Sequence, residues 1–206
     1  MSFTLRIICA ASERRMEIGM AIKIFIDQGH NPVNPNAGAE GNGYREQDIT
    51  YDIGMRLASL LRADPNFDVR TSRNDPNEII GNSNATSLAR RVTEANSWGA
   101  DYFISLHTNA SQSGAANGSE AFIYRLGSEA QYFAEQILTG LTAETGLARR
   151  GVFARPSLYV LRRTRMPAVL LEMGFITNRG DVFVMTSRPE ECAEGIYNGV
   201  IEYFGL

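Results

Sequence analysis

The sequence predicts a single α/β domain, with a twisted, mostly parallel sheet of about six strands and helices on both of its faces. Two observations predict this class. Short apolar runs typical of strands alternate along the chain with segments of helical periodicity, which is the spacing of α/β units. At 206 residues, of which 44% are hydrophobic, the chain is also long enough for one well-packed domain.

The elements follow in chain order. Strands are expected at residues 23–27 (KIFID), 67–73 (FDVRTSR), 101–107 (DYFISLH), 120–125 (EAFIYR), 157–163 (SLYVLRR) and 167–175 (PAVLLEMGF). Two helices are predicted from the spacing of apolar residues, the first by Ile49, Ile53, Leu57, Leu60 and Leu61, and the second by Leu88, Val92 and Ala95. Two more are expected over residues 128–144 and 190–204. The loops at 31–45, 74–87 and 108–119 carry Gly, Asn, Pro and Ser.

Charge and composition exclude several classes of protein. The formal net charge of −3 argues against a nucleic-acid or anionic-membrane partner, and no run approaches the roughly 18 apolar residues of a transmembrane helix. Cys9 and Cys192 lack metal-type spacing and predict free thiols. The apolar core of residues 1–22 is short and interrupted by Arg6, so we expect no signal peptide there. We expect a monomer whose domain spans residues 23–206.

The chain has two histidines, and each follows a predicted strand. His30 comes after IFIDQG, and His107 ends the run YFISL. In parallel sheets, sites form outside the carboxyl ends of the strands, where several loops meet. A strand-end histidine can be a structural residue hydrogen-bonded to a loop carbonyl, but two on neighbouring strand ends favour a divalent metal site.

Glu46 is the candidate third ligand. It lies three and seven residues before Ile49 and Ile53, so it shares the helix face that packs on the sheet. A buried carboxylate is costly unless it is paired or bound to metal, although a first-turn glutamate can also simply complement the helix dipole. Glu40, in a Gly- and Asn-rich loop, is expected to be solvated. A His, Glu, His set is a catalytic zinc pattern that leaves a fourth position for water.

Hydrolysis at zinc also needs a general base. Glu172 interrupts the apolar run VLLEMGF, where burial would favour Val or Leu, and beside a metal-bound water such a carboxyl could act as base and then acid. The alternative is an edge-strand glutamate that faces water. Glu120 opens another strand, where it either lines the same groove or is solvated.

Five blocks of the sequence together resemble a known family. In order, IFIDQGH, GNGYREQDI, LARRVTEANSWGADYFISLHTNA, NGSEAFIY and MPAVLLEMGFITN are similar to the zinc-dependent N-acetylmuramoyl-L-alanine amidases of type 3. The resemblance runs from about Lys23 to the C-terminus. It implies that His30, Glu46 and His107 bind one zinc ion and that Glu172 is the catalytic residue. The family usually has DPGH where this chain has DQGH, so we expect a less rigid turn before His30, with Gly29 still allowing the bend.

The resemblance implies a peptidoglycan hydrolase that acts at the bacterial cell wall. It would cleave the amide between N-acetylmuramic acid and the L-alanine of the stem peptide, with Asn109 and Glu120 as further substrate-binding candidates. The alternative enzyme is a zinc carboxypeptidase or another peptidase of peptidoglycan stems. A wall-binding module that has lost catalysis is disfavoured, because all three ligand candidates and Glu172 are present.

Overall fold

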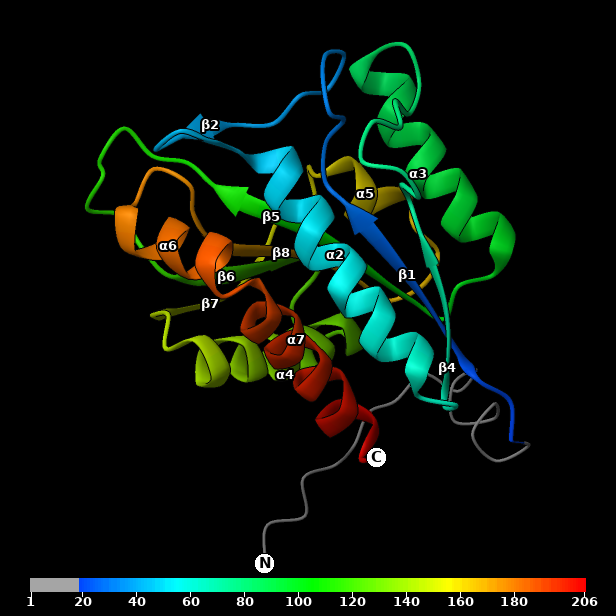
Figure 1. Cartoon of the computed structure of the whole chain (residues 1–206). Helices are drawn as coiled ribbons and strands as arrows, with labels where there is room; N and C mark the ends of the chain where they lie inside the picture. Colours follow the sequence, from blue (N-terminus) through cyan, green and yellow to red (C-terminus); the bar gives the residue numbers. More distant parts are fainter. Residues whose placement is uncertain (1–18) are drawn as a thin grey trace, which may run out of the picture.

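The computed structural model describes residues 19–206 and confirms the predicted fold class. Six strands form one sheet in the order β4-β1-β5-β8-β6-β7 (Figure 1). Their bounds are Ile22–Gln28 (β1), Phe67–Thr71 (β4), Tyr102–Asn109 (β5), Ser119–Ile123 (β6), Arg149–Ala154 (β7) and Ala168–Phe175 (β8). A separate two-stranded ribbon consists of β2 (Glu40–Gly41) and β3 (Tyr44–Arg45). Residues 1–18, which include Cys9 and most of the predicted N-terminal segment, lie outside the described residues.

The sheet changes direction at one place. Strands β4, β1, β5 and β8 run parallel, whereas β6 is antiparallel to β8 and parallel to β7. The carboxyl ends of β1, β5 and β8 therefore lie at the same edge as the beginning of β6. This edge is where the sequence places both histidines.

Helices cover both faces, as predicted. Their bounds are Glu46–Ala63 (α2), Asn84–Trp98 (α3), Glu129–Thr145 (α4), Tyr159–Arg163 (α5), Arg179–Ser187 (α6) and Pro189–Phe204 (α7). Helices α2, α4, α6 and α7 bury the larger apolar core on one face, with α4 packed on α7. Helices α3 and α5 bury a smaller core on the other face (Figure 1). The four predicted helices are α2, α3, α4 and α7, while the nine-residue α6 was not predicted.

The prediction of a strand at 157–163 is wrong. That stretch contains the short helix α5, which follows a turn in which the Leu158 N–H donates to the Arg155 carbonyl at 3.2 Å. Val160 and Leu161 are buried in the smaller core, and a run this short does not distinguish helix from strand by periodicity. The sixth strand is instead β7, with the sequence RRGVFA. As an edge strand it pairs only with β6 and is largely exposed, so it lacks the apolar run that marks the others.

Two further predictions concern the whole chain. Within residues 19–206, no helix is both long and apolar enough to cross a membrane. Cys192 is a buried free thiol, as expected, and burial raises the pKa of this thiol to about 12.

Candidate metal centre and active site

His30 lies directly after β1 in a constrained backbone conformation. Its φ of 68° is in the left-handed region, which is uncommon for a residue other than glycine. The bend is therefore made by His30 itself, and Gly29 has a different role from the one predicted. A Cβ at position 29 would lie 2.5 Å from His107 Cε1 and 2.6 Å from the Leu106 carbonyl oxygen. Gly29 is needed because the two histidine-bearing segments approach so closely.

Gln28, which replaces the proline usual in the family, is anchored on both its backbone and its side chain. Its N–H donates to Ser72 Oγ at 3.1 Å, a bond that proline could not make. Its amide oxygen accepts from the Arg73 N–H at 3.0 Å, and its amide nitrogen donates to the Arg73 carbonyl at 3.1 Å. The turn before His30 is thus held by hydrogen bonds of Gln28, and the lower rigidity relative to proline stays a prediction.

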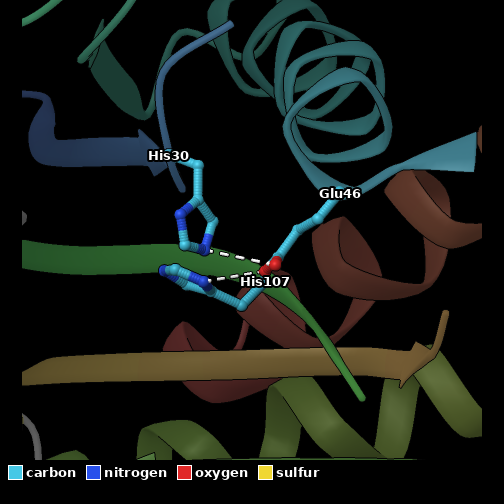
Figure 2. A group of neighbouring side chains, drawn as sticks. All are labelled: His30, Glu46 and His107. Atoms are coloured by element: carbon cyan, nitrogen blue, oxygen red, sulfur yellow. Dashed lines mark hydrogen bonds and ion pairs between the residues drawn. The ribbon is translucent and has the colours of Figure 1, made fainter. Parts of the chain in front are cut away.

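The carboxylate of Glu46 contacts both histidines (Figure 2). It is the first residue of α2 and is buried, with 3% of its surface exposed. One carboxylate oxygen lies 3.0 Å from His107 Nδ1 and accepts from the Thr108 N–H at 2.9 Å. The other lies 3.2 Å from His30 Nε2 and accepts from the Ala39 N–H at 2.9 Å. By contrast, Glu40 in the β2–β3 ribbon is exposed, as expected.

The electrostatics of Glu46 are those of an ionised carboxylate. Burial alone would raise its pKa, but hydrogen bonds to His107 and His30 and their charges outweigh burial and hold the pKa well below its usual range. The carboxylate is therefore ionised at neutral pH. Among residues 19–206, His30, Glu46 and His107 form a group whose candidate ligand atoms all lie within 4.8 Å of one another.

This donor set fits zinc. Imidazole nitrogens and a carboxylate oxygen are ordinary zinc ligands, and three of them leave one tetrahedral position open. The backbone N–H groups of Thr108 and Ala39 hold the carboxylate in place, as supporting groups commonly do around metal ligands. The structure brings together the three residues that the sequence singled out, and their role as ligands stays a prediction.

Glu172 lies on β8 beside His107. The two residues are cross-strand partners in the β5–β8 register. Because β8 is an interior strand, the alternative of an edge-strand glutamate facing water is wrong. Its Oε2 is buried and has no hydrogen-bond partner within the described residues. Burial, followed by the charges of Glu46 and Glu120, raises the pKa of Glu172 to about 8, although the Arg155 charge acts in the opposite direction.

Glu120 lies on the other side of Glu172, as its cross-strand partner on β6. It is 7% exposed, so the alternative of a solvated carboxylate is wrong. Asn109 donates its side-chain amide to Glu120 Oε1 at 2.7 Å, and Arg150 Nε donates to Oε2 at 2.8 Å. His107, Glu172 and Glu120 thus form a row across three adjacent strands, with Asn109 bound to its end.

Arg91 is a functional candidate that the sequence did not reveal. It lies on α3 and is 1% exposed. Its guanidinium donates to Asp27 Oδ1 at 2.5 Å, to the Gln28 carbonyl at 2.6 Å and to the His30 carbonyl at 2.6 Å. The arginine therefore fixes the backbone that carries His30. The sequence offers no signal for this, because one arginine on an amphipathic helix is normally solvent-facing.

A small cavity extends from the two histidines towards α5. Its volume is about 120 Å³, and its walls include Leu158, Tyr159 and Val160. The segment that had been predicted as a strand thus forms one wall beside the candidate metal centre.

The fold and the site together define a single-domain α/β protein with a His, Glu, His group that could hold a metal ion and a glutamate with a buried carboxyl oxygen beside it. The family model described as N-acetylmuramoyl-L-alanine amidase matches residues 24–202. The chain belongs to this family.

Named relatives agree with this assignment. The N-acetylmuramoyl-L-alanine amidase LytC of Bacillus subtilis (strain 168) is 35% identical over 186 residues, which cover 88% of this chain and 35% of LytC. The amidase CwlM of Bacillus licheniformis is 33% identical, with 90% of this chain and 70% of CwlM covered. The chain thus spans about a third of the length of LytC.

A solved structure shows the same fold. The catalytic domain of CwlV, an N-acetylmuramoyl-L-alanine amidase from Bacillus (Paenibacillus) polymyxa var. colistinus, superimposes with a TM-score of 0.78 at 30% identity. The match covers 89% of this chain and 98% of that domain.

Proposed function

We propose that the chain is a zinc-dependent peptidoglycan hydrolase that acts at the bacterial cell wall and cleaves the amide between N-acetylmuramic acid and L-alanine. One observation carries the proposal. Glu172, whose Oε2 is buried, lies in register with His107, one of the three clustered candidate ligands. Membership of the amidase family supports the choice of bond.

His30, Glu46 and His107 would hold the zinc ion. When bound, zinc polarises the scissile carbonyl and lowers the pKa of a water molecule towards about 7. Glu46 contributes the negative charge that favours a cation there. Arg91 and the Thr108 and Ala39 N–H groups keep the ligand-bearing segments in place.

Glu172 would be the general base and then the general acid. A carboxyl whose pKa is raised to about 8 by burial and neighbouring carboxylates can exchange protons near neutral pH. It would accept a proton from the attacking water at a carboxylate oxygen and then deliver it to the leaving nitrogen of L-alanine. Its Oε2 has no hydrogen-bond partner among the described residues, so no other group in that part of the chain competes for the proton there.

The other candidates are less well supported. A zinc carboxypeptidase could use the same chemistry, but the matched family and the relatives above are described as amidases. A module without catalysis would not need a carboxyl with a buried, unpaired oxygen next to the clustered histidines. Asn109 and Glu120 stay substrate-binding candidates, because they lie beside Glu172 in the same row.

The test is digestion of purified peptidoglycan followed by mass spectrometry. We expect free stem peptides with an L-alanine N-terminus. Shortened stems that remain attached to muramic acid would instead identify a peptidase. Glu172→Gln serves as the matched control for contaminating activity.

A further inference from the structure

The sheet face that carries the row His107, Glu172, Glu120 is only partly covered by helices. Helices α3 and α5 pack over the residues of β1, β5 and β8 on this face. Over β6 and β7, Phe122 is covered by the Arg155 guanidinium, 4.3 Å from the ring centroid. Phe153, the cross-strand partner of Phe122, is 45% exposed. The β7 end of this face therefore carries an exposed aromatic ring next to Phe122 and Arg155.

Arg155 differs from the arginines that precede it in this region. Arg149 pairs with Glu135, and Arg150 pairs with Glu120. Arg155 is exposed, and within residues 19–206 no carboxylate lies within ion-pair distance of it. Its contact with Phe122 is a cation–π contact, which holds the guanidinium in place without neutralising its charge.

Arg155 also lies close to the catalytic candidate along the sheet. Phe122, whose ring Arg155 covers, is two residues along β6 from Glu120 and pairs with Leu170, two residues before Glu172 on β8. A ligand group bound by Arg155 would therefore lie near Glu172. The position of Arg155 thus links the β7 end of this sheet face to the proposed chemistry.

The sequence around Arg155 has an unusual charge. Residues 145–171 contain six arginines and no Asp or Glu. The net charge of −3 therefore combines +6 over this segment with −9 over the rest of the chain. Arg149 and Arg150 are paired with carboxylates, but the other four arginines are exposed and form no ion pair within the described residues. This segment therefore presents a basic surface, which attracts anionic ligands.

We propose that Arg155, supported by the Phe122 ring, forms a subsite that binds a carboxylate of the stem peptide during hydrolysis. This inference rests on the proposed function and names a specificity determinant for it. A peptide carboxylate fits because guanidinium and carboxylate form a charge-assisted, bidentate pair. A stem peptide whose C-terminus is not cross-linked offers such a group there.

The experiment compares two synthetic substrates, an N-acetylmuramoyl tripeptide with free carboxylates and the same compound with carboxamides in their place. Arg155→Gln is measured beside Arg162→Gln, an exposed arginine of α5 in the same basic segment. We expect Arg155→Gln to raise KM about tenfold for the carboxylate substrate, with kcat nearly unchanged and no effect on the carboxamide. Arg162→Gln should change neither substrate, and Arg155→Lys should retain part of the preference.

Three results would overturn the inference. Equal losses on both substrates would indicate that Arg155 only supports the local structure, and unchanged kinetics would show that it does not contact the substrate. Equal effects of Arg155→Gln and Arg162→Gln would indicate general attraction by the basic surface. Failure of the proposed function looks different, because the wild-type protein would then release no L-alanine-terminated peptide from either compound.

Discussion

His107 on β5 and Glu172 on β8 are cross-strand partners. This relationship places a proposed metal ligand and a proposed general base side by side through backbone pairing alone. Since the side chains of partner residues in neighbouring strands point to the same face of a sheet, the geometry does not depend on a flexible loop. Substitution of His107 should nevertheless impair zinc binding, whereas substitution of Glu172 should impair proton transfer.

The first prediction concerns metal content. Wild-type protein should bind one zinc ion per chain, at ligand distances of roughly 2.0 to 2.2 Å. His107→Ala should lose most of it, and Glu46→Gln should weaken affinity because a neutral amide oxygen is a poorer zinc ligand than a carboxylate. Metal analysis after dialysis against a chelator checks this. Full occupancy in His107→Ala would contradict the assignment.

The second prediction concerns Glu172. Glu172→Gln is nearly isosteric and should keep both zinc and substrate binding, while the loss of proton transfer lowers the rate by about 10² to 10⁴. Zinc content and release of L-alanine-terminated peptides are measured on the same preparation. Near-normal turnover would refute the mechanism, and loss of zinc would make Glu172 a ligand instead of a base.

The third prediction concerns Arg91, whose guanidinium ties α3 to Asp27 and the His30 backbone. Arg91→Met leaves the Asp27 carboxylate buried without its cation, and breaking a buried pair in this way costs about 3 to 5 kcal/mol. The free energy of unfolding in urea should fall by that order, and zinc affinity should fall with it. The neighbouring exposed Arg90 provides the control, since Arg90→Gln should change neither quantity. Equal stability of the two variants would contradict the role given to Arg91.

The fourth prediction concerns Gly29. Gly29→Ala places a methyl group against the His107 ring and the Leu106 carbonyl, both closer than 3 Å, so the two histidines should be forced apart and zinc affinity should drop. Gly114→Ala is the matched control, because its nearest neighbour lies 3.5 Å away. Isothermal titration of the metal-free proteins with zinc measures both. Wild-type affinity in Gly29→Ala would show that the close approach does not matter.

The sequence predicts those parts of the fold that leave a strong pattern. The runs that became β1, β5 and β8 are continuous and apolar because these strands are buried on both faces. Strand β7 leaves no such pattern, since it lies at the sheet edge and is mostly exposed. The stretch at 157–163 was mistaken for a strand because two buried apolar residues in a five-residue helix fit either period.

Some residues of the candidate site could likewise be predicted from the sequence, and others could not. His30, Glu46 and His107 could be proposed from the sequence because each is a chemically distinctive residue at the end of an element. Arg91 and Arg155 could not, since their roles depend on tertiary contacts with Asp27 and Phe122. The total charge was also uninformative, because acidic residues elsewhere in the chain offset the basic segment.

The reversal of β6 has a consequence for how this scaffold can be altered. Strands β5 and β8 end at the site, whereas β6 begins there. The loop over residues 110–118 therefore connects the end of β5 to the start of β6, just before Glu120. The position of Glu120 is set by its pairing with β8 and β7 and not by the loop before it. Residues could therefore be inserted into or removed from this loop while His107, Glu172 and Glu120 keep their spacing. The architecture thus separates a loop whose length can vary from a row of side chains whose spacing is set by strand pairing.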